Sequence, residues 1–295
     1  MASTPAARLR PRETEDPLNL HLYHPLAARL ARLLLPTGIP ANAVSVLSAV
    51  ALVGAALSFT LLAWPLGAIA GFALMLLWHV VDGADGDLAR LKGTASPTGE
   101  LVDGVCDYFG NTFMYFAFAF LLDNTLGGWA WALAIAAGAS HIVQTNHAES
   151  QRRAYLWRAY GVAWLRNDAA EGVPKFGGGN WFTRYFGFWA VGYLWLANRM
   201  SPGANAIDAA LAAAANDPRR IRRIQRLVRS TSRGSMLLQQ ALGANPKTLV
   251  IGGSMLLGSP MWFFLIEIVP LNLLLIWSVI HHNRQTRRLA AALNG

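Results

Sequence analysis

Five long apolar runs constrain the fold of this chain more than any other feature. They cover residues 42–63, 66–81, 101–122, 129–144 and 249–280, and the first four are each close to the roughly 20 residues that a helix needs to cross the hydrocarbon core. Only 14% of the 295 residues are charged, against about 25% in soluble domains. Because backbone polar groups inside lipid must pair within their own segment, such runs fold as helices. The sequence therefore predicts an all-α integral membrane protein.

Basic residues predict how these helices are oriented. The N-terminus, the loop at Arg90 and Lys92, the region after the fourth run and the C-terminus are basic, whereas the connections near Trp64 and Asp123 lack Lys and Arg. Cytoplasmic loops carry the excess of positive charge in membrane proteins, so the basic regions should lie inside the cell.

The last apolar run is too long for one span, and Gly258, Ser259 and Pro260 interrupt it. We expect a hairpin there that turns between residues 258 and 270. The count is then six transmembrane helices with both termini inside. This topology predicts a multi-pass protein, in a bacterial inner (cytoplasmic) membrane.

Charge and periodicity divide the chain into five expected parts. These are a disordered cytosolic tail over 1–17, an interfacial amphipathic helix over 18–36, transmembrane spans 1–4 over 37–148, a basic cytoplasmic insert over 149–245 with an apolar helix at 181–197, and a C-terminal transmembrane hairpin with a basic tail over 246–295. Basic sequence flanks the apolar helix of the insert on both sides, so we expect it to be interfacial or re-entrant. The arginine cluster at 219–233 lacks the aromatic residues of a nucleic-acid site, so attraction to anionic membrane lipids is its expected role.

Four aspartates stand where the second and third spans meet the cytoplasm. Asp82 and Asp85 are three residues apart, and Asp103 and Asp107 are four apart, so each pair shares one face of its helix. The short loop between the pairs makes the two helices antiparallel neighbours. All four carboxylates can therefore converge at one depth, where ionisable groups are costly and usually functional.

Four carboxylates this close must take up protons or recruit cations. Oxygen-only ligation favours Mg²⁺ or Mn²⁺, and two such ions about 3.5–4 Å apart could clamp a diphosphate. Pairing with Arg90 and Lys92 alone is a weaker explanation, because two cations cannot neutralise four buried anions together with Asp87. The active site that this predicts faces the cytoplasm.

The pattern D-x2-D-G-x2-A-R-x8-G-x3-D-x3-D runs without exception from Asp82 to Asp107. It resembles the signature of the CDP-alcohol phosphotransferase (CDP-alcohol phosphatidyltransferase) family, membrane enzymes of phospholipid biosynthesis. The segment Ile39–Ser45 is similar to the opening of the family's first span, although Ala41 stands where Pro is common, and Lys247-Thr248 resembles its C-terminal part. The resemblance covers about residues 20–148 and 245–290, and nothing in 149–244 contributes to it.

The resemblance implies roles for individual residues. Two ions, Mg²⁺ or Mn²⁺, would be held by Asp82, Asp85, Asp103 and Asp107. Asp107 would also be the general base on the acceptor hydroxyl. The CDP moiety would contact Gly86, Ala89, Arg90, Gly99, Asn42 and Ser45. Members of the family are commonly homodimers with six spans, which implies a homodimer here.

The resemblance implies that the chain is a transferase of substituted phosphate groups. The expected reaction moves a phosphatidyl group from CDP-diacylglycerol to a small polar alcohol and releases CMP. The inverse remains open: a CDP-activated small alcohol could give its phospho-alcohol to a lipid hydroxyl. The acceptor is equally open, and Arg152, Arg153 and Lys247 are candidates for binding a phosphate on it.

Two further alternatives remain from the residues alone. A divalent-cation carrier could use the aspartates as a transport site, but it has no use for Gly86, Ala89, Arg90 and Gly99 at fixed spacing. A membrane prenyltransferase also binds diphosphate through Asp and Mg²⁺, but it would need a second Asp-rich segment, which the sequence lacks.

Overall fold

The computed structural model describes residues 11–162, 181–202 and 204–294, and every regular element in these ranges is helical. The elements are η2 (Arg12–Thr14), η3 (Asn19–Tyr23), α1 (His24–Leu34), η4 (Leu35–Thr37), α2 (Ala41–Leu61), α3 (Leu66–Lys92), α4 (Pro97–Leu126), α5 (Gly128–Tyr160), α6 (Trp181–Met200), α7 (Ala204–Ala213), α8 (Pro218–Ala241), α9 (Ala244–Leu256), α10 (Met261–Ile268) and α11 (Pro270–Asn294). The predicted all-α fold class is confirmed for the described residues.

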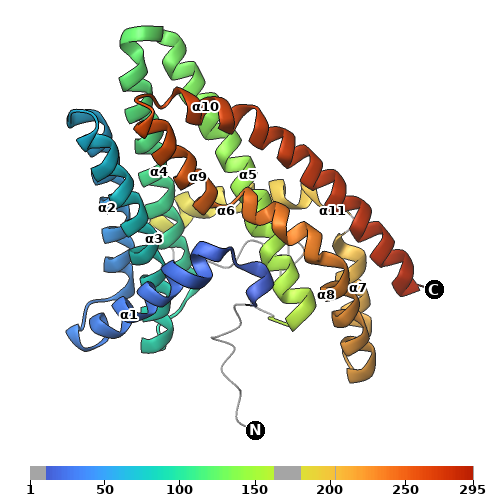
Figure 1. Ribbon diagram of the computed structural model, residues 1–295. Coiled ribbons are helices and arrows are strands. Elements are labelled where there is room, and N and C mark those ends of the chain that lie inside the picture. Colours follow the sequence, from blue (N-terminus) through green and yellow to red (C-terminus); the bar gives the residue numbers. More distant parts are fainter. Residues whose placement is uncertain (1–10, 163–180, 203, 295) are drawn as a thin grey trace.

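Helices α2, α3 and α4 form a bundle in which α2 packs against both of the others (Figure 1). Its centre is a large apolar cluster that α5, α9 and α10 complete, with Leu52, Met75, Phe118 and Phe263 among its buried side chains. Burying such side chains away from lipid and water fixes which helix faces meet. The bundle therefore holds the C-terminal half of α3 and the N-terminal half of α4 in place through α2.

The sequence between α3 and α4 contains its own stop and start signals. Gly93 adopts a positive φ of 67° and closes α3, with the N–H of Gly93 donating to the Arg90 carbonyl and that of Thr94 to the Ala89 carbonyl. Ser96 caps α4 by accepting the Gly99 N–H at 3.1 Å. This turn sends α4 back alongside α3, which brings the two acidic pairs together.

Within the described ranges, four helical segments are long and apolar enough to cross a membrane: Ala41–Leu61, Leu66–Lys92, Thr98–Leu126 and Met261–Leu293. The protein is therefore an integral membrane protein. The predicted count of six spans stays a prediction, because α5 carries buried polar side chains such as Gln144 and His147, and α9 has only 13 residues. The C-terminal turn lies between α9 and α10, where Gly258 has a φ of 86°, inside the range in which the hairpin was expected to turn.

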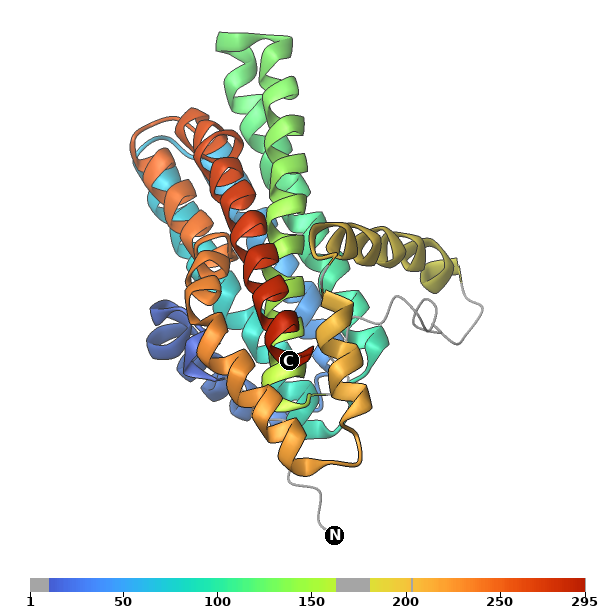
Figure 2. The same cartoon turned by 90° about the vertical axis from the view of Figure 1, so that its right-hand side faces the viewer.

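The segment after α5 forms a second, peripheral cluster of helices. Helices α7, α8 and α11 pack with the end of α5 around Tyr155, Ile207, Ile224 and Leu289. Helix α6 lies across the long axes of α4 and α5 (Figure 2), the orientation of a helix in the plane of the membrane. Its interfacial or re-entrant position remains a prediction.

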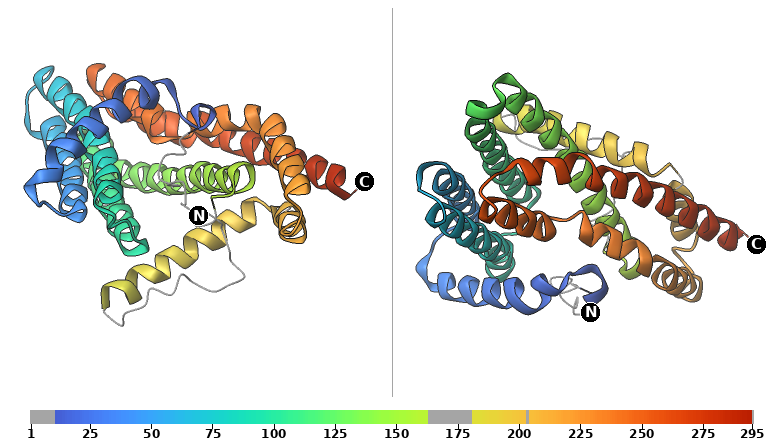
Figure 3. Two further views of the ribbon diagram at one scale, coloured as in Figure 1. Left: turned by 90° about the horizontal axis from the view of Figure 1, so that it is seen from below. Right: turned by 45° about the horizontal axis from the view of Figure 1, so that its top comes forward.

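The N-terminal segment makes long-range contacts. Residues 1–10 lie outside the described residues and residues 11–17 include the short helix η2, so the disordered tail expected over 1–17 stays a prediction. Two tyrosines, Tyr155 and Tyr160, donate to a carboxylate oxygen of Glu13, and the Gln240 amide donates to two backbone carbonyls at 3.1 and 3.2 Å. Local composition did not reveal these long-range partners. The segment leads into α1, which packs on α3 beneath the bundle (Figure 3).

Candidate metal centre and substrate site

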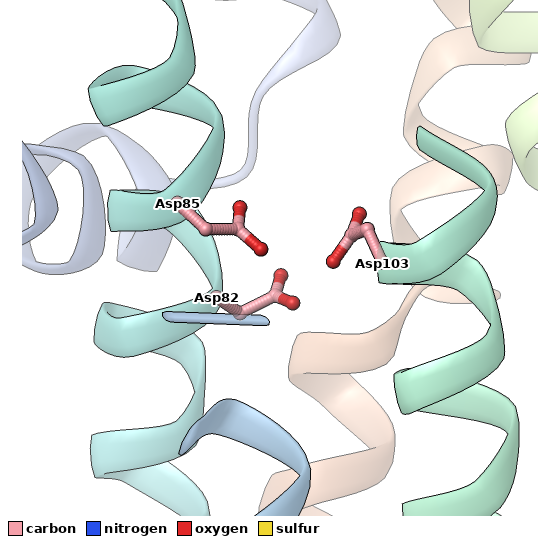
Figure 4. Close-up of side chains that lie close together, drawn as sticks. All are labelled: Asp82, Asp85 and Asp103. Atoms are coloured by element: carbon pink, nitrogen blue, oxygen red, sulfur yellow. The ribbon is translucent and has the colours of Figure 1, made fainter. Parts of the chain in front are cut away.

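Three carboxylates converge between α3 and α4. Asp82, Asp85 and Asp103 each offer one oxygen, and these oxygens all lie within 4.8 Å of one another. Figure 4 shows Asp82 and Asp85 leaving one helix toward Asp103 on the facing helix. The helical spacing puts each acidic pair on one helix face, and α2, which packs against both α3 and α4, holds the two faces toward each other.

Helix α2 fixes the orientation of one of these carboxylates. Ser45 is buried, and its hydroxyl donates to Asp85 Oδ2 at 2.5 Å. A hydroxyl donor aimed at one oxygen selects one rotamer of the aspartate and leaves the other oxygen for a ligand. Sequence reasoning placed Ser45 near the nucleotide; the structure places it against Asp85.

Asp107 has a different environment from the other three. It lies one turn beyond Asp103 on α4 and outside the group of converging oxygens. Its Oδ1 accepts the indole N–H of Trp78 at 3.1 Å, and its backbone carbonyl accepts the Asn111 amide at 2.8 Å. Nothing in the aspartate spacing predicts Trp78, although its position four residues before Asp82 puts it on the same face of α3.

The four aspartates form no ion pair with a basic side chain in the part of the chain that the structure describes. Arg90 pairs instead with Asp87 at 2.6 Å, and Lys92 donates to the Ile39 carbonyl at 2.5 Å. The Oδ1 atoms of Asp82 and Asp103 are buried without a hydrogen-bond partner. Such oxygens are costly unless a proton or cation reaches them. An all-oxygen set of this kind fits Mg²⁺ or Mn²⁺.

The residues expected around the CDP moiety follow the aspartates along α3 and into α4. A Cβ on Gly86 would lie 3.3 Å from a guanidinium nitrogen of Arg90, so Gly86 leaves room beside that cation. Asn42 is exposed, and its Oδ1 is 3.7 Å from the place where a Cβ on Gly99 would be. Ala89 is half-buried in the same last turn of α3. The structure thus places Gly86, Ala89 and Arg90 in the last turns of α3 and Asn42 beside the start of α4.

The sequence model of the CDP-alcohol phosphatidyltransferase family matches residues 39–211, which is more than half of the chain. The chain belongs to this family. The match runs through α6 into α7, so residues 149–211 of the insert are matched although the motifs indicated no resemblance there, whereas the matched range does not reach the C-terminal part around Lys247. No protein among the curated sequences matches the chain.

Membership in the CDP-alcohol phosphatidyltransferase family defines the reaction class. The family transfers a phosphoalcohol or phosphatidyl group from a CDP-alcohol, and its members use divalent cations. The chain is accordingly a membrane transferase. The acidic cluster is the part of this structure with the chemistry to hold those cations.

The three basic residues expected at the head group of a CDP-alcohol phosphatidyltransferase acceptor are not gathered in one place. Arg152 binds Glu149 through two hydrogen bonds of 2.7 and 2.8 Å, and this carboxylate raises the pKa of Arg152 above its ordinary value. Arg153 lies 3.7 Å from Glu100, one turn before Asp103, and therefore close to the acidic cluster. Lys247 is buried and paired with Glu267 at 2.8 Å.

Proposed function

We propose that the protein transfers a phosphatidyl group from CDP-diacylglycerol to a small polar alcohol and releases CMP. The observation that supports this most directly is the convergence of Asp82, Asp85 and Asp103 within 4.8 Å, in a chain that belongs to the family. Phosphoryl transfer needs positioning, charge stabilisation and a base for the nucleophile. The site offers a group of residues for each of these.

Asp82, Asp85 and Asp103, with Asp107, would hold two Mg²⁺ or Mn²⁺ ions. When bound, these ions would neutralise charge on the diphosphate of the donor. Ser45 keeps Asp85 oriented toward them through its 2.5 Å hydrogen bond. Three features support these roles for the four carboxylates: their charge, their proximity to one another and their match to the family's motif.

The cytidine nucleotide would lie on the cytoplasmic side of the carboxylates, beside Gly86, Ala89, Arg90 and Gly99, with Asn42 at the start of α2. Asp107 would accept the proton of the acceptor hydroxyl. The hydroxyl oxygen then forms a bond to the β-phosphorus of the donor, and the bond from that phosphorus to the bridging oxygen of CMP breaks. CMP leaves with the electron pair.

Arg153 is the favoured residue for binding a phosphate on the acceptor. Its ion pair with Glu100 is long, at 3.7 Å, whereas Arg152 is held by two short hydrogen bonds and Lys247 is enclosed by protein. We further propose a homodimer in a bacterial inner membrane with this site facing the cytoplasm, in keeping with the basic residues at that end of the helices.

The test uses the purified protein in lipid nanodiscs with Mn²⁺. One reaction contains CDP-diacylglycerol with pooled alcohols, and the second contains CDP-choline and CDP-ethanolamine with diacylglycerol. We expect CMP only in the first, with the product identified by lipid mass spectrometry. Chelation with EDTA and Asp103→Asn should each abolish release.

The matched control is Asp123→Asn, at the outer end of the same helix, where the carboxylate accepts the Trp131 N–H. It should release CMP at the wild-type rate. CMP in the second reaction alone would establish the inverse direction. Full activity of Asp103→Asn would refute the metal role of the cluster, and metal flux without CMP release would indicate a carrier.

A further inference from the structure

Trp78 is the only side chain outside the acidic motif that the described residues place in hydrogen-bond contact with the Asp107 side chain. The indole nitrogen lies 3.1 Å from Asp107 Oδ1, and this bond joins α3 to α4. Indole has one N–H and no acceptor, so the bond has a single direction. Trp78 is buried, and its N–H would be left without a partner if the Asp107 side chain rotated away.

The surroundings of Trp78 hold the ring in place. It belongs to the large apolar cluster at the centre of the bundle. The His79 ring lies 4.3 Å from it, and His79 is in turn bound to the Thr248 hydroxyl at 2.8 Å and packed on the Tyr23 ring at 4.7 Å. A donor fixed on several sides can hold a carboxylate in one orientation.

We propose that Trp78 is a positioning residue that holds the Asp107 carboxylate in the orientation needed at the metal centre. The bond engages one oxygen of Asp107 and leaves the second oxygen available for a ligand. Helix α4 fixes the position of the Asp107 backbone, but the side chain can rotate, so a hydrogen-bond partner is needed to hold it in one rotamer. Ser45 acts in the same way on Asp85, from a different helix.

This inference rests on the proposed function for the identity of the site, but its test does not depend on turnover. Partners that orient a metal-binding side chain typically change metal affinity or activity by about 10- to 100-fold when they are removed. Trp78→Phe removes the N–H and keeps a ring in the core. We expect it to weaken Mn²⁺ binding, measured by electron paramagnetic resonance titration of the full-length protein, by about tenfold or more.

The chain offers a matched control. Trp131 donates to Asp123 Oδ1 at 3.0 Å, which is the same kind of bond at the outer end of α4. Trp131→Phe should leave Mn²⁺ affinity unchanged. Trp78→His, which retains a ring N–H, should recover part of the affinity that Trp78→Phe loses.

A double-mutant cycle shows whether Trp78 acts through Asp107. In an Asp107→Asn background, Trp78→Phe should have no further effect on Mn²⁺ affinity, because the group that it orients has already been changed. Independent, additive losses would overturn the inference, as would a Trp78→Phe variant that binds Mn²⁺ like Trp131→Phe. If the wild type binds Mn²⁺ and shows this cycle but releases no CMP from any CDP-alcohol, the proposed function fails and the positioning role stands.

In active protein, the kinetics of the same variants distinguish an effect on the orientation of Asp107 from an effect on substrate binding. Trp78→Phe should lower kcat by about tenfold or more, and the KM for the CDP donor should change by less than about threefold. A purely structural role would instead lower the folded fraction and leave the kcat of the folded remainder unchanged.

Discussion

Replacing Lys247 by Met tests whether this lysine has a structural or a substrate-binding role. The Lys247 ammonium group has three N–H donors, and it donates to Glu267 Oε1 and to Gln144 Oε1, both at 2.8 Å; His141 Nδ1 at 3.2 Å is the third acceptor in the tautomer that carries the proton on Nε2. The side chains of Lys247 and Glu267 are 3% and 0% exposed. No donor is left for a phosphate, so we expect a structural role that joins α9 to α5 and α10.

The expected loss of stability follows from the buried groups that lose a partner in Lys247→Met. Glu267 Oε2 already lacks a hydrogen-bond partner, and the substitution removes the cation from Oε1. Breaking a buried pair by removing one partner costs about 3–5 kcal/mol, because the other charge stays buried without its cation. In Lys247→Met, the His141 ring nitrogen, 3.4 Å from Glu267 Oε1, remains beside the carboxylate. At about 2–4 °C per kcal/mol for a chain of this size, the melting temperature should fall by roughly 6–20 °C.

Thermal unfolding in detergent micelles, followed by tryptophan fluorescence, measures this change. Lys247→Met/Glu267→Gln removes both charges and should recover most of the loss. Lys92→Met is the control, because Lys92 has one backbone hydrogen bond at the end of the bundle and should contribute about 1 kcal/mol or less. Wild-type stability in Lys247→Met, together with a raised KM for a phosphorylated acceptor only, would refute this reasoning and place Lys247 at the substrate.

Three other predictions concern the site and the bundle. Asp103→Asn should reduce the number of Mn²⁺ ions bound per chain in a titration, and an unchanged number would contradict its role as a ligand. Ser45→Ala should weaken Mn²⁺ binding by about tenfold, since it frees the Asp85 side chain to rotate; equal affinity in both proteins would exclude this orienting role. Gly67→Ala should lower the stability of the fold by about 1–3 kcal/mol, because the added Cβ would lie 2.6 Å from the Leu62 and Ser58 carbonyl oxygens. Gly253→Ala is the control: its Cβ would meet nothing within 4 Å, so it should be neutral or slightly stabilising.

Much of the architecture could be predicted because it follows from local rules. The apolar runs, the Gly93 and Ser96 signals and the helical spacing of the acidic pairs each depend on a few neighbouring residues. The i, i+3 rule also could have found the Arg90–Asp87 pair, because the two residues are three positions apart on α3. The number of transmembrane helices was harder to predict. Polar side chains along α5 lower its mean hydropathy, although other helices bury them.

The amino-acid sequence by itself determined the reaction class, through the motif from Asp82 to Asp107, and the sharing of one helix face within each acidic pair, because helical spacing is a local property. The convergence of Asp82, Asp85 and Asp103 also needs α2, which packs against both α3 and α4. Only the tertiary structure decided which distant residue contacts each buried polar side chain. Ser45 bonds to Asp85, Trp78 bonds to Asp107, and Glu267 pairs with Lys247. The physical reason is that a polar side chain in a membrane bundle must find a partner wherever packing brings one. Those partners lie 40, 29 and 20 residues away along the chain, beyond the reach of any local pattern.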